Sequence, residues 1–434
     1  VSTTAAPVST TAAPVSTTAA PVSTTAAPTT TLAPAPSFSP LTGFAQFSDA
    51  DDASFRFAVE DEFRKAVAKA GVSVAVFDGE RLWTYTEGTA SSTEPLTSTT
   101  PMVIRSTSKT FLGALMTEQI ENGLYGLDDT IEELLFDHPD YELIDVANVN
   151  TDATVEQLLT MTSGIADWSA PEDLMSRIEI MLDPAWRPAR NLSKIKKSFV
   201  PPGSYSYSYA NSIILGLIAE KYGGKPLNSL YQERFFGPLG LSGGLLPDVA
   251  WNPDTAIAYD YLENYNAGTG FGAVDDGSMA AFRGLDPRVS WAGAGIVSTA
   301  ENVAVWGYEL FSPSGSAISD QAQSRLLESV TVETDTSISG LGVHTYGYYI
   351  GAADVSLSDG TRISTFTHPG GGGGRTSWLY YAPSLDVSIS LLANSMVLHD
   401  FGACRYQGWD YVSVGECMAG GIFSSLLGLP VFAG

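Results

Sequence analysis

The sequence predicts an α/β (α+β) fold, in which an antiparallel sheet is flanked by helices and a mostly helical lobe is inserted between its strands. The first observation is that short strand-like runs lie at both ends of the folded part, at about 50–110 and 335–434. The second is that helical spacing dominates between them, at about 111–334. We expect the two ends to complete one sheet lobe, with the helical lobe beside it and a cleft at the junction.

The N-terminal segment differs in composition from the rest of the chain. Residues 1–28 are four copies of Val-Ser-Thr-Thr-Ala-Ala-Pro, and no charged side chain occurs before residue 40. Such a segment cannot bury enough apolar surface to fold. We predict a disordered stalk or linker over 1–40, which is either a mucin-like spacer of an exported protein or an ordinary disordered tail. One folded domain then covers 45–434.

The elements of the sheet lobe follow in order. Apolar side chains three and four positions apart predict an amphipathic helix over 51–70. Two strand-like runs, 72–79 and 81–88, are separated by a turn and predict an antiparallel hairpin. An apolar helix is expected near the C-terminus, at about 417–428. Before it come four short strand-like runs, at 346–350, 363–368, 377–381 and 387–392.

A Ser-x-x-Lys pattern opens the helix that follows the hairpin. Ser106 and Lys109 lie at the start of an apolar run with the spacing of a buried helix face. Residues three apart on a helix share a face, so the two side chains should project together. A serine hydroxyl becomes a good nucleophile when a base takes its proton, and lysine can be that base when burial or nearby positive charge lowers its pKa. We predict that Ser106 is the nucleophile and Lys109 its base.

A Tyr-x-Asn pattern precedes another apolar helix. The hydroxyl of Tyr209 could serve as a general base or proton shuttle near an ammonium group. The amide of Asn211 could orient a substrate carbonyl or the lysine. Three tyrosines alternate with serines in this segment, and they could equally form one face of an edge segment.

A glycine run follows the strand-like segment that ends at His368. Glycines let a ligand approach the backbone closely. The run could place a backbone N–H opposite that of Ser106 and complete an oxyanion hole, worth about 3 kcal/mol per donor. A phosphate loop is excluded because no Gly-Lys-Ser/Thr follows the glycines. The alternatives are a flexible glycine turn and a structural histidine.

The composition excludes several classes of partner. The chain has 48 acidic against 22 basic side chains and a formal net charge of −26, so its surface repels nucleic acids and anionic membranes. No apolar run reaches the roughly 18 residues of a transmembrane segment. The four histidines show no metal-ligand spacing, and we expect neither a metal site nor a cofactor.

Two cysteines, Cys404 and Cys417, lie close together near the C-terminus. They predict one short-loop disulfide in an exported protein, and two buried free thiols otherwise. The chain begins with Val1 and shows no signal segment, so we expect a mature or truncated product. Together with the stalk, these features favour a secreted, periplasmic or cell-envelope-associated protein.

Taken together, these segments resemble the serine β-lactamase-related superfamily. Its nearest group contains class C β-lactamases, D-alanyl-D-alanine carboxypeptidases, D-aminopeptidases and the related family VIII carboxylesterases. Two further segments are similar to motifs of this superfamily: 158–168 to its LLTHTSGL segment, and 292–302 to its AGGLVST segment. The order and rough spacing of the motifs agree over about 55–395. The resemblance implies a β-lactamase/transpeptidase-like fold.

The resemblance also implies a role for each site residue. Ser106 would be the acylated nucleophile, Lys109 its base and Tyr209 the proton shuttle, although the identity of the base is disputed in this class. The substrate-binding residues would be Asn211, His368, Gly370 and Gly371. The backbone N–H groups of Ser106 and Gly371 would form the oxyanion hole.

Two departures from the family pattern affect the expected substrate. The third motif reads His368-Pro369-Gly370 instead of His-Thr-Gly or Lys-Thr-Gly. Proline has neither a hydroxyl nor an N–H, so the usual donor to a substrate carboxylate is missing. Met161 replaces the histidine of LLTHTSGL, for which we expect only a packing consequence.

The expected function is a serine hydrolase that forms an acyl-enzyme on Ser106. The first expectation is a D-alanyl-D-alanine carboxypeptidase or β-lactamase relative acting on a peptide or amide bond. A carboxylesterase or D-amino-acid amidase of the same fold is the alternative that Pro369 favours. A catalytically silent envelope-binding protein is a further alternative. The partner would be a small peptide, amide or ester, with a peptidoglycan stem peptide among the candidates, and the oligomeric state stays open.

Overall fold

The computed structural model describes most of the predicted folded domain. The predicted stalk lies outside the described residues up to residue 37, and so does Cys404. The described residues are 38–66, 71–90, 94–169, 179–180, 183–246, 287–334, 343–372, 375–394, 398–399 and 412–431.

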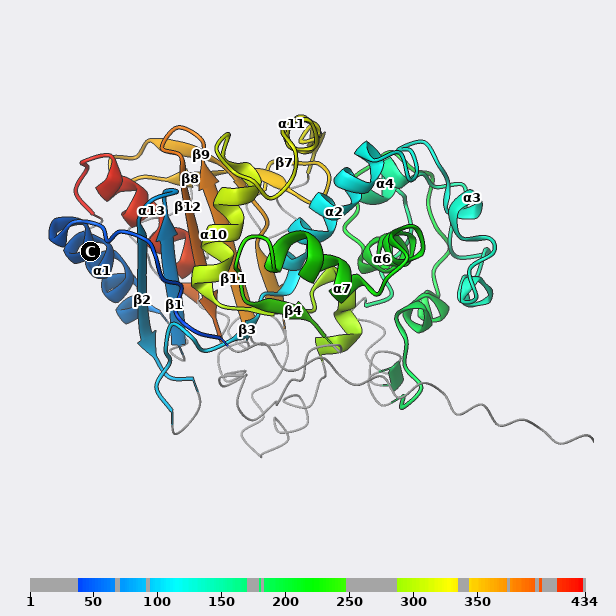
Figure 1. The fold of residues 1–434 in the computed structure, drawn as a ribbon, viewed down its shortest axis with the longest axis horizontal. Helices are drawn as coiled ribbons and strands as arrows, with labels where there is room; N and C mark the ends of the chain where they lie inside the picture. The colour runs from blue at the N-terminus through cyan, green and yellow to red at the C-terminus, as the bar shows by residue number, and fades with distance from the viewer. Residues whose placement is uncertain are drawn as a thin grey trace, which may run out of the picture. The chain divides into compact units, whose positions relative to one another are not determined.

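An antiparallel sheet of nine strands organises this part of the chain (Figure 1). The N-terminal hairpin joins the C-terminal strands because β1 pairs with β12, with Val72 opposite Ala393. The predicted fold class is therefore confirmed. The order across the sheet is β2 (Leu82–Gly88), β1 (Gly71–Phe77), β12 (Val387–Ala393), β11 (Arg375–Ala382), β9 (Arg362–Thr367), β8 (Gly351–Ser356), β7 (Thr345–Tyr346) and β6 (Val332–Glu333), and β10 (Gly370–Gly372) also pairs with β11.

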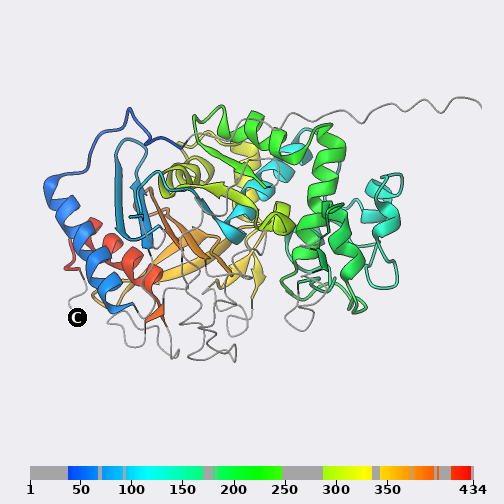
Figure 2. The same cartoon turned by 90° about the horizontal axis from the view of Figure 1, so that it is seen from below.

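Helices cover both faces of the sheet. On one face, α1 (Asp49–Lys65) and α13 (Val414–Leu426) lie side by side, as the blue and red helices of Figure 2 show. On the other face, α10 (Ala300–Phe311) packs against β1, β11 and β12. Both faces of β1 are thus buried along the whole length of the strand, which explains why most of its side chains are apolar.

The helical lobe contains α3 (Ile131–Leu135), α4 (Val155–Leu159), α6 (Tyr209–Gly223) and α7 (Leu227–Tyr231). A small antiparallel sheet lies beside it, with β5 (Ile296–Ser298) between β3 (Met102–Val103) and β4 (Gly243–Leu245). Helix α10 lies by sequence within the predicted range of the helical lobe, 111–334, and packs on the large sheet. Another helix, α11 (Asp320–Glu328), contacts α2 (Lys109–Glu121).

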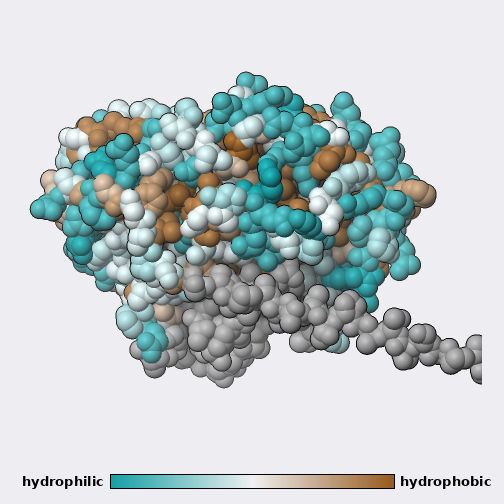
Figure 3. Space-filling view, in the orientation of Figure 1, coloured by the Kyte–Doolittle hydropathy of each residue, from teal (hydrophilic) through white to brown (hydrophobic). Residues whose placement is uncertain are grey.

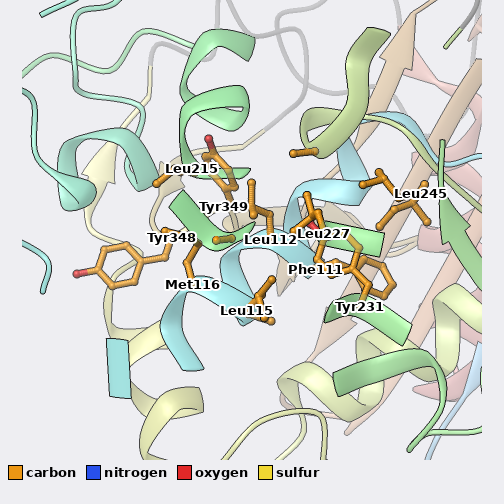
Figure 4. Packing of buried hydrophobic residues seen from close by; sticks show 14 of the residues in the cluster. Phe111, Leu112, Leu115, Met116, Leu215, Leu227, Tyr231, Leu245, Tyr348 and Tyr349 are labelled. Carbon is orange, nitrogen blue, oxygen red and sulfur yellow. The ribbon is translucent and has the colours of Figure 1, made fainter. Parts of the chain in front are cut away.

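Helix α2 (Lys109–Glu121) runs through the centre of the molecule, and residues 109–119 are all buried. Its Phe111 stacks on Trp306 of α10, with ring centroids 3.8 Å apart. Figure 4 shows its side chains among residues of the helical lobe, including Leu215 and Tyr231. The apolar side chains of α2 thus pack against both the helical lobe and α10. The residues just before α2 are therefore anchored in both parts of the fold.

The surface of the described residues mixes polar and apolar side chains. In the view of Figure 3, hydrophilic residues cover most of the visible face and hydrophobic ones lie between them in small groups. None of the described helices combines the length and the apolar character that a membrane span requires.

Candidate active site

Ser106 lies on a short 3₁₀ turn, Arg105–Ser108, that leads directly into α2. The sequence predicted Ser106 in the first turn of the α-helix, but the α-helix begins only at Lys109 and Ser106 lies in the turn before it. Side chains fix the turn to the large sheet: Thr107 Oγ1 donates to the carbonyl of His368 at 2.8 Å, and Ser377 Oγ of β11 donates to Ile104 O at 2.6 Å. Ser106 is held between the two parts of the fold and is only 4% exposed.

Three side chains reach the Ser106 hydroxyl. Lys109 Nζ lies 3.4 Å from Ser106 Oγ, so the two predicted partners do meet. Tyr209 Oη lies 3.1 Å from the same oxygen, as its predicted role requires. Tyr207 Oη donates a hydrogen bond to it at 2.7 Å. The distances bring the predicted nucleophile, base and shuttle together, and they add a tyrosine that the sequence analysis did not select.

Lys109 is fully buried, and burial lowers the pKa of its ammonium well below the usual value. The carboxylate of Asp167 opposes this effect and the guanidinium of Arg105 adds to it. Lys109 Nζ donates to Gly293 O at 2.6 Å, which orients it. A lysine with a depressed pKa can hold its amine neutral near neutral pH and accept a proton from serine.

Tyr207 and Tyr209 are two residues apart at the start of α6: Tyr207 lies in the segment that leads into the helix, and Tyr209 is the first helical residue. Ser208 between them has extended backbone angles and caps the helix, with its Oγ accepting from Ala210 N at 3.2 Å. Alternate residues of an extended chain point to one side. The alternating tyrosines were a signal for Tyr207, since Tyr207 and Tyr209 both reach Ser106 Oγ. Burial raises the pKa of the Tyr207 phenol well above its ordinary value, so it keeps its proton.

Asn211 is fully buried on α6, and its hydrogen bonds go to the segment that resembles LLTHTSGL. Its Oδ1 accepts from Ser163 Oγ at 2.8 Å, and its Nδ2 donates to Met161 Sδ at 3.4 Å. Met161 has a left-handed backbone, with φ of 58°. The expected packing role of Met161 is therefore incomplete, because its sulfur also accepts a hydrogen bond from the predicted substrate-binding amide. A direct contact of Asn211 with substrate stays a prediction.

His368 is joined to the nucleophile turn through its carbonyl, which accepts a hydrogen bond from Thr107 Oγ1. Its ring hydrogen-bonds Tyr346 Oη through Nε2 at 2.8 Å, and its Nδ1 lies 2.8 Å from Pro369 O. Burial, helped by the charge of Lys109, lowers the pKa of this histidine to about 3, so the ring is neutral at ordinary pH. The His368 and Tyr207 rings are 6.4 Å apart. Its predicted role in substrate binding is not tested by these contacts.

The glycines of β10 run beside the nucleophile turn. A Cβ placed on Gly370 would lie 2.7 Å from the backbone N of Ser106, so only glycine fits there. A Cβ placed on Gly371 would meet its nearest neighbour, Thr376 Cγ2, at 3.7 Å, which is ordinary contact. The backbone of β10 thus passes close to the Ser106 N–H, as an oxyanion hole between Ser106 and Gly371 requires. The donation by Gly371 itself stays a prediction.

Within the described ranges, no group of three or more His, Cys, Asp or Glu side chains is arranged to hold a metal ion. The predicted disulfide cannot be followed completely, because Cys404 lies outside these ranges. Cys417, on α13, is buried and is not a free thiol.

This geometry defines a class of protein. A serine hydroxyl held between a buried lysine and phenol hydroxyls, next to a large antiparallel sheet, is the site of a Ser-x-x-Lys serine hydrolase. The Beta-lactamase family profile matches residues 58–412, and the chain belongs to this family. The family resemblance seen in the sequence motifs is confirmed.

Similar proteins include several that act on D-amino acid compounds by name. The D-aminopeptidase of Cereibacter sphaeroides is 29% identical over 235 residues, which are 52% of this chain and 43% of that protein. This chain therefore spans less than half the length of that relative. The structure of D-amino acid amidase from Ochrobactrum anthropi SV3 complexed with D-phenylalanine has a TM-score of 0.67 and 20% identity, covering 88% of this chain and 99% of the other.

A D-stereospecific amidohydrolase from Streptomyces sp. is also similar. Its structure has a TM-score of 0.60 and 22% identity, and the match covers 79% of this chain and 94% of the other. At these identities the two solved structures establish the fold alone.

Proposed function

We propose that this protein hydrolyses amides of D-amino acids that carry a free amino group, through an acyl-enzyme on Ser106. The observation that carries the proposal is the Ser106 hydroxyl, which lies within hydrogen-bond distance of Lys109 and Tyr209. The names of the relatives, a D-aminopeptidase and a D-amino acid amidase, support the amide bond and the D configuration.

The geometry supports the following sequence of steps. The neutral amine of Lys109 takes the Ser106 proton while Oγ attacks the amide carbonyl. The carbonyl oxygen, now negative, accepts hydrogen bonds from the backbone N–H groups of Ser106 and Gly371. When the C–N bond breaks, the leaving amine takes a proton from the Lys109 ammonium, with the Tyr209 hydroxyl between them. Water then releases the D-amino acid from Ser106.

The third motif argues against a carboxypeptidase or β-lactamase activity. Pro369 stands where the family commonly has threonine, and it can donate no hydrogen bond to a substrate carboxylate. D-Alanyl-D-alanine peptides and penicillins both carry such a carboxylate. Amides of D-amino acids lack it, so the missing donor costs them nothing.

Asp167 supports a substrate that carries a positive charge. Its carboxylate interacts electrostatically with Lys109. Both of its oxygens are fixed by Ser169, whose backbone N and Oγ each donate at 2.9 Å. Burial raises the pKa of Asp167, whereas the hydrogen bonds from Ser169 and the charge of Lys109 favour its ionised form. In that form it favours an ammonium group on the substrate over a second anion.

We further propose that the protein works in an exported location. The Ser/Thr/Pro-rich repeats are typical of extracellular spacers, and the bonded state of Cys417 fits an oxidising compartment. Mass spectrometry of peptides from the freshly isolated protein, with and without reduction, tests this. A free thiol at Cys417 in freshly isolated protein would contradict it.

The test of the proposed function is release of ammonia from D-phenylalanine amide, with the Ser106→Ala variant as control. We expect turnover of the D-amide that disappears in the variant, weak turnover of the L-amide, and none of an N-acetylated D-Ala-D-Ala peptide. Turnover of p-nitrophenyl acetate without any amide hydrolysis would favour the esterase alternative. Equal turnover by Ser106→Ala would overturn the serine mechanism.

A further inference from the structure

Two tyrosines, and not one, hold the nucleophile. Tyr207 Oη is 2.7 Å from Ser106 Oγ, whereas Tyr209 Oη is 3.1 Å from it. Both rings also flank the amine of Lys109, whose Nζ lies 4.7 Å from the Tyr207 ring centroid and 4.1 Å from that of Tyr209. The rings themselves meet edge to face at 5.7 Å. The shortest contact to the nucleophile is thus made by the tyrosine outside the Tyr-x-Asn motif.

We infer that Tyr207 is a second catalytic tyrosine, which keeps its proton and donates a hydrogen bond to Ser106 Oγ when this oxygen leaves the acyl-enzyme. The inference rests on the proposed function, because it assumes an acyl group on Ser106. The two tyrosines then have different catalytic roles: Tyr209 passes a proton to the leaving amine, and Tyr207 stabilises negative charge on the serine oxygen.

The direction of the hydrogen bond follows from the surroundings of Tyr207. The side chain is buried beside Tyr209, and burial raises the pKa of its phenol well above the ordinary value although the amine of Lys109 lies over its ring. The protonated phenol therefore persists, and its hydroxyl points at Ser106 Oγ. A serine oxygen can accept two hydrogen bonds, so it can receive Tyr207 while its own proton goes to Lys109.

The two halves of the reaction place different demands on this donor. During acylation, a hydrogen bond to Oγ makes the serine more acidic but also less nucleophilic, and the two effects oppose each other. During deacylation, Lys109 takes a proton from the attacking water and the bond from the carbonyl carbon to Oγ breaks. Its electron pair stays on Oγ, which then takes a proton from the Lys109 ammonium. A donor already at Oγ stabilises the charge at that moment. Loss of Tyr207 should therefore slow deacylation more than acylation.

The chain provides a matched control in Tyr205. It lies two residues before Tyr207 in the same alternating segment, and its ring packs edge to face on Tyr346 at 5.4 Å. Burial of its phenol resembles that of Tyr207, since its pKa is also raised by burial. Removal of its hydroxyl tests the effect of a lost phenol in this segment without touching Ser106.

The experiment compares wild type, Tyr207→Phe and Tyr205→Phe with the p-nitroanilide and the p-nitrophenyl ester of D-phenylalanine, which form the same acyl-enzyme. For Tyr207→Phe we expect kcat to fall about 100-fold and to become equal for both substrates. A burst of one equivalent of released p-nitroaniline or p-nitrophenol should precede the steady state. Intact mass should then show the D-phenylalanyl adduct at steady state. Tyr205→Phe should behave as the wild type, and matched melting temperatures of all three proteins would establish that they are folded.

The outcomes separate the two proposals. Absence of Ser106-dependent turnover in the wild type would overturn the proposed function. Normal turnover by the wild type, with Tyr207→Phe as fast as Tyr205→Phe, would overturn only the role of Tyr207. A slow Tyr207→Phe that shows no burst and no adduct would also overturn it, since the lost step would be acylation. If Tyr207→Phe melts early, Tyr207→His, which restores an N–H donor, should recover part of the deacylation rate.

Discussion

The two segments that meet at Ser106, the turn Arg105–Ser108 and the strand β10, are held in place in different ways. Side chains from several elements fix the turn, and three hydroxyl or amine groups converge on the Ser106 oxygen. The strand β10 consists of glycines, and its fit depends on the absence of side chains. The turn keeps the motif residues of the family, whereas the edge before β10 departs from the family at Pro369. The turn Arg105–Ser108 thus keeps the catalytic groups in place, whereas the edge before β10 is where substrate preference can differ from that of the family.

The largest expected effect on activity comes from Lys109, which follows the turn Arg105–Ser108. Lys109→Met removes the base but keeps a buried chain of similar length, so kcat should fall by about 10³-fold or more. The fold should persist, because methionine suits the apolar surroundings better than an amine does. Steady-state kinetics with D-phenylalanine amide and a thermal melt measure both. Activity within tenfold of the wild type would mean that Lys109 is not the base.

The next effect tests the close approach of β10. Gly370→Ala adds a methyl group 2.7 Å from Ser106 N, so the strand or the turn must move. We expect kcat/KM to fall about 100-fold, since small displacements at the reacting atoms are costly. Gly371→Ala is the matched control, because its methyl group has room and its backbone N–H remains. An equal loss in both variants would show that the close contact at Gly370 is not decisive.

A smaller effect is expected where the family pattern is restored. Pro369→Thr returns a hydroxyl to the third motif, and acylation by benzylpenicillin should increase about tenfold, the value of one hydrogen bond to a charged group. Pro369→Val, which has the shape of threonine without its hydroxyl, serves as the control. Intact mass after timed exposure to benzylpenicillin gives the rates. Equal rates in the two variants would mean that the hydroxyl does not reach the substrate carboxylate.

The smallest effect is a displacement of the pH profile. The carboxylate of Asp167 raises the pKa of Lys109, so Asp167→Asn should lower that pKa further. The reaction needs the neutral amine, whose fraction grows as pH rises through this pKa. The acidic limb of kcat/KM should therefore move to lower pH in the variant. A shift to higher pH would contradict the electrostatic link between the two side chains.

Much of the fold could be predicted from the sequence because the signals were local. The N-terminal hairpin, the apolar helix α2 and the C-terminal strands follow from periodicity and turn residues. The position of α10 could not be predicted in this way. Its apolar pattern indicates a buried helix, but it does not say whether the partner is the sheet or the helical lobe.

In the site too, the residues in local sequence motifs could be predicted, whereas those brought together only by the fold could not. Ser106, Lys109 and Tyr209 stand in short motifs, and the structure brings them together at hydrogen-bond distance. Tyr207 was not selected, because alternating tyrosines fit an ordinary edge segment equally well until the position of Ser106 is known. The contact between Met161 and Asn211 was also missed, since a contact between residues 50 positions apart leaves no local sequence pattern.

The burial of α2 on every side bears on how the protein loses activity when it is heated. Its side chains pack against the helical lobe and against α10 on the large sheet. Unfolding of either part would therefore expose α2, so the two parts should unfold together. Local fraying, which begins at exposed ends and loops, has no short route to Ser106. Heat inactivation should then coincide with cooperative melting of the whole domain.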